Sequence, residues 1–247
     1  MKKINVTIWN EFTHEKTNEA VKAIYPDGLH ATIKSFQDKD ETLNVRLAAL
    51  DDPDQGLPDD VLNSTDVLMW WGHMRHGDVK DSLVAKIRRR VISEGMGLVA
   101  MHSAHASKPF CSIVGTDGAL SWGDEQPEIV WNLLPSHPIA AGIPESFHLE
   151  MEEMYGEPYN IPQPDALVFT SWFKNGNIFR SGCCFLRGLG KVFYFQPGHE
   201  SCPSFHNEYV EKILNNGIHW AAPNNFGIHV PTHFPAISSV TKKYGID

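Results

Sequence analysis

Residues 97–107 read GLVAMHSAHAS, and their pattern is the clearest indication of the fold. Its first five residues form a short apolar run, typical of a buried strand, and small residues then form a turn. Many α/β enzymes place a nucleophilic serine or cysteine at such a strand-to-helix corner. Here the corner carries His102, and a second histidine, His105, follows three residues later. The stretch therefore predicts an α/β fold with imidazoles at the corner.

The segments before this stretch alternate between strand and helix patterns. Apolar runs at residues 4–10, 44–50 and 66–71 read as strands, and those at 17–24, 29–36, 58–63 and 79–94 as helices. Such alternation predicts βαβ units and a flavodoxin-like, doubly wound, mostly parallel sheet. Because the strands are apolar on both faces, we expect helices on both sides of the sheet.

The pattern changes after residue 105. Residues 106–165 are rich in Pro, Gly, Glu and His, and we expect a β-rich insertion folded over the sheet. Two later strands are joined by Leu189-Gly190 as a hairpin, and an amphipathic helix follows at about residues 205–220. We therefore predict one domain over residues 1–223, with the insertion inside it, and a C-terminal extension over 224–247.

Composition excludes several classes of protein. The 247 residues carry a net charge of −9, and the basic run Arg88–Arg90 falls on the solvated face of a predicted helix, so nucleic-acid binding is not expected. No apolar run approaches the roughly 20 residues of a membrane span. Four cysteines without C-x-x-C spacing indicate a reduced, cytoplasmic protein.

Polar residues follow four of the predicted strands. In an open parallel sheet the carboxyl ends of the strands meet at one edge, where ligands bind. We therefore expect one shared site, rich in imidazole, at this edge. The candidates are Glu11, His14, His73, His76, His102, Ser103, His105, His199 and Glu200.

Two chemistries need several imidazoles and carboxylates together. Neutral imidazole binds divalent metals, and catalytic zinc takes three protein ligands and a water. An unperturbed imidazole also titrates near neutral pH, which suits acid–base catalysis. No H-E-x-x-H motif is present, so any ligands come from separate loops. The insertion adds Glu153, Tyr155 and Trp122, whose indole suits stacking on a sugar ring.

Several motifs, in order, resemble the trehalose-utilisation (ThuA-like) family over residues 4–223. They are WNEFTHE, WWGHMRHGDV, GLVAMHSAHASKPF, EEMYGEP, FRSGCCFLRGLGKVFYFQPGHE and NGIHWAAP. The resemblance implies a fold related to class I glutamine amidotransferases. It also implies a role in the catabolism of trehalose or related disaccharides, acting on keto-sugars made by a partner dehydrogenase. Amidotransferases carry a cysteine at this corner, and none of the four cysteines lies there, so we exclude glutaminase activity.

Our first hypothesis is a metal-assisted isomerase, lyase or hydrolase of sugars, with zinc as the expected metal and no nucleotide cofactor. The expected ligands are drawn from His14, His73, His102 and His199. We expect acid–base roles for His76, His105, Glu153 and Glu200, and substrate contacts from Glu11, Ser103, Trp122 and Tyr155.

Two alternatives stay open. One is a metal-free hydrolase with Ser103 as nucleophile, His199 as base and Glu200 or Glu153 orienting it. The other is a non-catalytic module that binds a sugar or a metal. In either case the partner is a small sugar, and the extension over 224–247 offers a surface for a homo-oligomer.

Overall fold

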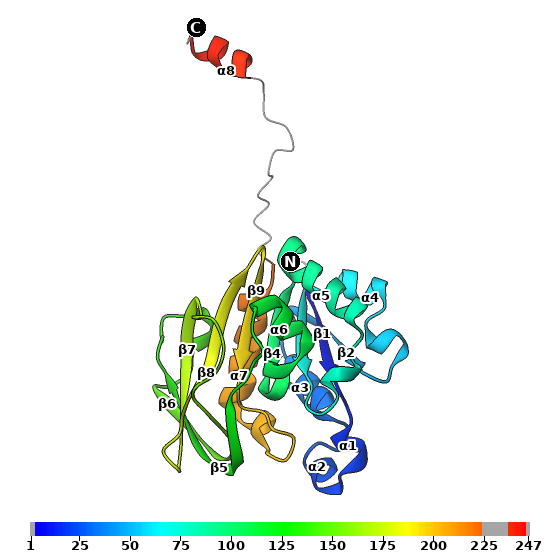
Figure 1. The fold of residues 1–247 in the computed structure, drawn as a ribbon, viewed down its shortest axis with the longest axis vertical. Helices are drawn as coiled ribbons and strands as arrows, with labels where there is room; N and C mark the ends of the chain where they lie inside the picture. Colours follow the sequence, from blue (N-terminus) through cyan, green and yellow to red (C-terminus); the bar gives the residue numbers. More distant parts are fainter. Residues whose placement is uncertain (1–2, 224–236, 246–247) are drawn as a thin grey trace.

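The computed structural model describes residues 3–223 and 237–245. Its centre is one nine-stranded sheet with the strand order β2-β1-β3-β4-β9-β8-β7-β5-β6 (Figure 1). The strands are β1 (Ile4–Asn10), β2 (Leu43–Ala49), β3 (Val67–Trp71), β4 (Gly97–Met101), β5 (Ser121–Asn132), β6 (Ser146–Gly156), β7 (Ala166–Phe173), β8 (Ile178–Arg187) and β9 (Gly190–Phe195).

Half of the sheet is parallel. Strands β2, β1, β3, β4 and β9 pair in parallel, and successive residues point alternately into two separate cores. Helices α3 and α7 pack into one core, and α4, α5 and α6 into the other. The helices are α1 (His14–Thr17), α2 (Glu19–Ile24), α3 (Leu29–Gln37), α4 (Asp59–Ser64), α5 (Asp81–Glu94), α6 (Lys108–Val114), α7 (Glu208–Ala221) and α8 (Ile237–Tyr244).

The other half is antiparallel, which corrects the expectation of a mostly parallel sheet. The pairs β9–β8, β8–β7, β7–β5 and β5–β6 are antiparallel, so the eight pairings divide equally. Strands β5 and β6, from the expected insertion, extend the sheet instead of forming a separate layer on it (Figure 1). The hairpin between β8 and β9 turns at Gly188-Leu189, one residue before the predicted position.

One part of this antiparallel half does reach over the strand ends. Residues 128–131 of β5 pair with both β6 and β7, whereas residues 121–126 pair only with β6. The β5–β6 pairing is irregular between Gly123 and Glu125 and between Gln126 and Glu128. Bulges bend a strand and increase its twist. We call residues 121–126 and 152–156 the β5–β6 arm; the bend carries it to the carboxyl end of β4.

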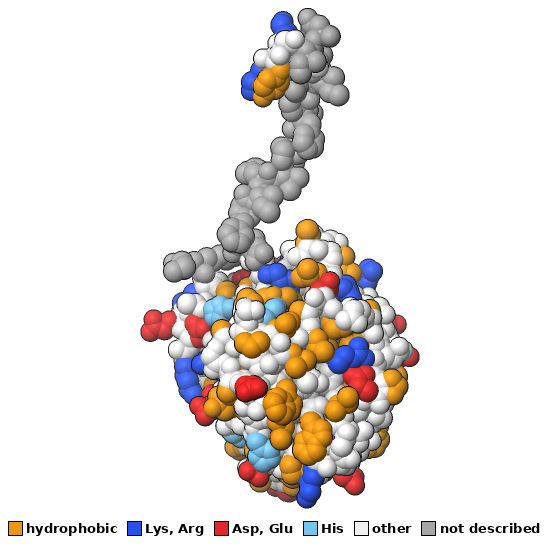
Figure 2. Space-filling model, turned by 90° about the vertical axis from the view of Figure 1, so that its left-hand side faces the viewer, with side chains coloured by type: hydrophobic (Ala, Val, Ile, Leu, Met, Phe, Trp, Pro, Cys, Tyr) orange, Lys and Arg blue, Asp and Glu red, His pale blue; other side chains and the backbone are white. Residues whose placement is uncertain are grey.

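The outer face of the antiparallel half carries apolar side chains among polar ones (Figure 2). Trp131, Trp172 and Ile178 are 40%, 39% and 58% exposed on strands β5, β7 and β8. No helix among the described residues is long and apolar enough to cross a membrane. Most of the expected C-terminal extension, residues 224–236 and 246–247, lies outside the described residues, and the expectation of an oligomer through it stays untested.

The start of β4 packs directly against the end of α7, and this contact gives a stability prediction. A Cβ atom at Gly97 would lie 2.5 Å from the carbonyl oxygen of Ala221. We expect Gly97→Ala to lower the free energy of unfolding by about 1–3 kcal/mol, because the backbones must separate. Gly77→Ala is the matched control, since a Cβ there meets nothing within 4 Å. Urea denaturation measures both; equal stabilities of the two variants would contradict the prediction.

Candidate active site

The carboxyl ends of β1, β3, β4 and β9 bring four histidines to one edge of the sheet. His14 begins α1 after β1, His73 follows β3, His102 follows β4, and His199 follows β9. The ring centroids of His102 and His199 lie 5.1 Å apart, those of His73 and His199 5.5 Å, and those of His14 and His73 5.3 Å. Four segments far apart in the sequence therefore build one cluster of imidazoles.

His102 occupies the corner after β4 in a left-handed conformation, with a φ of 50°. Its side chain is fully buried, and its Nδ1 atom lies 2.8 Å from the carbonyl oxygen of Gln196. Because a carbonyl oxygen only accepts, Nδ1 carries a proton. The other nitrogen, Nε2, lies 2.9 Å from Oε2 of Glu153 and 3.2 Å from the hydroxyl of Tyr155.

His199 is held in a similar way by two residues that the sequence analysis did not single out. Its Nδ1 atom lies 2.6 Å from the hydroxyl of Ser201, and this hydroxyl donates to Glu125 over 2.6 Å. Because the hydroxyl gives its one proton to Glu125, Nδ1 of His199 donates to the hydroxyl in this arrangement. The Ser201 amide would donate to Nδ1 in the other tautomer, but at 3.3 Å it is the weaker contact. Nε2 therefore faces Glu200 at 3.4 Å and Glu153 at 3.9 Å.

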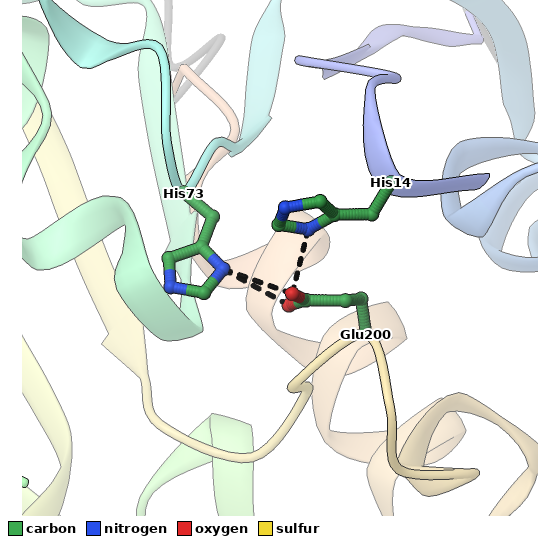
Figure 3. Close-up of side chains that lie close together, drawn as sticks. All are labelled: His14, His73 and Glu200. Atoms are coloured by element: carbon green, nitrogen blue, oxygen red, sulfur yellow. Dashed lines mark hydrogen bonds and ion pairs between the residues drawn. The ribbon is translucent and has the colours of Figure 1, made fainter. Parts of the chain in front are cut away.

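Glu200 lies between His14 and His73 (Figure 3). Its Oε1 atom is 2.6 Å from Nδ1 of His14, and Nδ1 of His73 is 3.0 and 3.1 Å from its two oxygens. The carboxylate is 6% exposed. Among the described residues, the ion pairs of Glu153 and Glu200 are with histidines alone.

The surrounding groups shift the pKa values of His102 and His199 in opposite directions. Burial opposes the charge on His102, but the hydrogen bond to Glu153 and the charges of Glu153 and Glu152 raise the pKa of His102 above its ordinary value. Burial and the charge of His102 lower the pKa of His199. Burial opposes ionisation of Glu153 and of Glu200 too, yet the facing histidines lower the pKa of both carboxyls.

Two other carboxylates near the cluster bind the backbone. Glu11 is 1% exposed, and its oxygens accept from the amides of residues 73, 74 and 75. Glu152 is fully buried and accepts from the amides of Gly198 and His199. Glu11 therefore holds the loop that carries His73, which differs from the substrate contact expected from the sequence.

A pocket of about 460 Å³ opens beside the cluster. Trp122, from the β5–β6 arm, is 70% exposed at its rim, and the hydroxyl of Tyr155 contacts His102. His105 donates from Nδ1 to the carbonyl of Gly118 over 2.7 Å, which leaves its Nε2 as an acceptor. The lining residues are His73, Met74, His76, Ser103, His105, Ala106, Trp122, Glu153 and Tyr155.

Ser103 lines this pocket but is not arranged as a nucleophile. It is 3% exposed, and its hydroxyl donates to the carbonyl of Gly72 over 2.7 Å. The serine that contacts His199 is Ser201, whose proton goes to Glu125. The described residues therefore contain no Ser103–His199 pair of the kind that the serine hydrolase alternative requires.

Potential metal ligands fall into two neighbouring sets. His102, Glu153 and His199 have ligand atoms within 4.8 Å of one another, and so do His14, His73 and Glu200. The four histidines expected to share one metal are thus divided two and two. Glu153 and Glu200, expected as acid–base groups, each complete a set of two imidazoles and a carboxylate. A third set, Glu125, His199 and Cys202, overlaps the first.

Fold and site together define an α/β protein with a mixed sheet and an imidazole-rich edge, in which His102 lies at the corner after β4. The family model ThuA, described as trehalose utilisation, matches residues 5–221. The chain belongs to this family, which confirms the resemblance seen in the sequence. Among curated proteins, none matches the sequence significantly.

Solved structures show the same fold at low sequence identity. A putative ThuA-like protein from Parabacteroides merdae is 15% identical, with a TM-score of 0.66 and coverage of 95% of both chains. A cytoplasmic protein from Salmonella typhimurium is 13% identical, with a TM-score of 0.61, over 88% of this chain and 99% of that one. A glutamine amidotransferase from Thermotoga maritima is 9% identical, with a TM-score of 0.54, over 89% and 98%. At these sequence identities, the similarity shows only that the chains share a fold.

The environment of His105 predicts how stability depends on pH. Burial lowers the pKa of His105 to about 4. Between this value and about 6.5, the unfolded chain binds a proton at this residue that the folded chain does not. Stability should therefore fall as the pH drops from 7 to 4, and less steeply in His105→Asn. Urea denaturation at several pH values measures the difference; parallel curves for the two proteins would exclude this origin.

Proposed function

We propose that this protein is a metal-assisted enzyme that acts on a sugar or keto-sugar, as an isomerase, lyase or hydrolase. One observation carries the proposal. His102 and His199 both have Nδ1 bound to an oxygen, so both present Nε2 to the carboxylate of Glu153. The neutral imidazoles direct two nitrogen lone pairs at this one carboxylate. A proton on Nε2 of His102 satisfies the contact at 2.9 Å, and a divalent cation in its place would serve both rings.

This donor set fits a divalent transition metal. Ligating histidines usually donate their second ring nitrogen to a carbonyl or carboxylate, which fixes the tautomer. The Gln196 carbonyl does this for His102, and Ser201 with Glu125 does it for His199. Two histidines and a glutamate form one of the known ligand sets of catalytic zinc. Bound there, a metal polarises a carbonyl or hydroxyl oxygen of the substrate.

The residues around the pocket supply the other functions. Burial lowers the pKa of His76 and of His105, so both imidazoles are neutral at pH 7 and can accept a proton from a bound sugar. The indole of Trp122, exposed at the rim, offers an apolar face to a sugar ring. The pocket, at about 460 Å³, falls within the usual range for small-molecule sites.

The family supports the choice of substrate class. Its description as trehalose utilisation favours trehalose or a related disaccharide, and a ketone in one ring would give the metal an oxygen to polarise. A cytoplasmic location follows the description of the Salmonella structure. We therefore propose keto-disaccharides, derived from trehalose or its relatives, as substrates.

The test combines metal content with turnover. We expect His102→Ala to lose one metal equivalent per chain and to turn over a keto-trehalose about 100-fold more slowly. Mutating a residue that hydrogen-bonds to a metal ligand typically lowers activity about 10- to 100-fold, and removing the ligand itself should lower it at least as much. Mass spectrometry of the elements measures the metal, and NMR follows the sugar. His148→Ala is the control, since its side chain is 47% exposed and its ion pair is with Glu150, outside the site.

A chain stripped of metal should lose turnover and regain it when zinc or manganese is restored. Full turnover by the stripped, folded chain would overturn the metal-assisted mechanism. Metal binding without turnover of any keto-sugar would instead favour a non-catalytic module.

A further inference from the structure

We propose that the protein binds two divalent cations side by side, with His14, His73 and Glu200 holding the second. This inference rests on the proposed function, because it places the second cation beside the first, at His102, His199 and Glu153. The second set comes from α1, the loop after β3 and the loop after β9, and this last loop also carries His199 of the first set (Figure 3). Its three ligand atoms lie within 4.8 Å of one another.

The strongest sign of a ligand is the Nδ1 atom of His14. This atom is buried and has no hydrogen-bond partner, although Oε1 of Glu200 lies only 2.6 Å away. The contact therefore lacks the alignment of a hydrogen bond, and it pairs opposite charges only when the ring of His14 carries a second proton. A cation that both atoms face would satisfy them, because imidazole nitrogen and carboxylate oxygen are common ligands of zinc and manganese.

Glu200 also has the position of a carboxylate shared between two cations. Oε1 faces His14 and His73 of the second set, while Oε2 lies 3.1 Å from His73 and 3.4 Å from Nε2 of His199 in the first set. The rings of His73 and His199 meet edge to face, with their centroids 5.5 Å apart. The two sets are therefore neighbours that share the region of Glu200, and two-metal sites in proteins hold their ions about 3.5–4 Å apart.

The charges around the cluster agree with this assignment. Among the buried carboxylates beside the histidines, Glu11 and Glu152 are satisfied by backbone amides. Glu153 and Glu200 face imidazoles only, one in each set. Each set thus contains one carboxylate, Glu153 or Glu200, whose charge is faced by imidazoles and not by backbone amides.

A pair of cations narrows the substrate class. Two neighbouring metals bind two oxygens of one substrate, such as the carbonyl and the adjacent hydroxyl of a keto-sugar. His73 and Glu153, one from each set, both line the pocket. The substrate expected here is therefore an α-hydroxy ketone of a sugar ring, with both oxygens directed at the cluster and the remainder toward Trp122.

The experiment counts cations in the full chain. After chelation and removal of metal, Zn²⁺ is titrated back by calorimetry, and the bound metal is measured by elemental mass spectrometry. We expect two equivalents in the wild type and in His148→Ala, and one in His14→Ala. His73→Ala removes a ligand of the same set from another segment and should also bind one. Circular dichroism identifies any variant that fails to fold.

A second readout distinguishes a pair from two separate sites. With Mn²⁺ in place of Zn²⁺, electron paramagnetic resonance should show an exchange-coupled pair in the wild type and an isolated ion in His14→Ala. One equivalent in the wild type, unchanged in His14→Ala, would overturn the second site and leave the proposed function intact. Two equivalents retained in His14→Ala would overturn the assignment of His14, and no bound metal in any protein would overturn both proposals.

Discussion

The site depends on the carboxylate of Glu152, which joins the two halves of the sheet. Glu152 lies on β6, the edge strand of the antiparallel half, and accepts from the amides of Gly198 and His199 over 2.7 and 3.0 Å. The hydroxyl of Ser204 contacts it as well. Neighbouring residues of a strand point to opposite faces, so the anchoring of Glu152 directs Glu153 toward the histidines. One buried carboxylate thus positions both the loop of His199 and the group that faces it.

The parallel half and its polar edge could be predicted from the sequence, and the contribution of the antiparallel half could not. Apolar runs mark β1, β3 and β4, and parallel pairing brings their carboxyl ends together, so histidines after those strands had to meet. The bend of the β5–β6 arm depends on irregular pairing near Glu125 and Glu128, which no periodic pattern reveals. For this reason Glu125 and Ser201, which orient His199, were missed. The helix α6 was missed too, although Ser107 caps it.

Two glutamates near the carboxyl ends of the parallel strands have different roles, which the residue type alone could not predict. Glu11 and Glu153 are both buried or nearly so beside histidines, and the sequence analysis named both as candidates for the site. Glu11 is saturated by three backbone amides, as is expected of a group that holds a loop. Glu153 instead faces His102 and His199. The partner of the carboxylate separates a structural role from a chemical one, and partners become visible only when the chain is folded.

The surroundings of His102 hold a strained backbone conformation at the corner after β4. A left-handed conformation at a residue other than glycine costs about 1–3 kcal/mol and persists only where the surroundings hold it. His102 adopts φ 50° with Nδ1 bound to Gln196 and its ring stacked on Tyr155 at 4.9 Å. A cysteine has no ring to stack on Tyr155, and its single sulfur could not bind Gln196 and present a second polar atom at the same time. The corner after β4 thus presents an imidazole nitrogen in a fixed direction. A nitrogen so fixed, with a carboxylate 2.9 Å away, has the geometry of a ligand or a proton carrier.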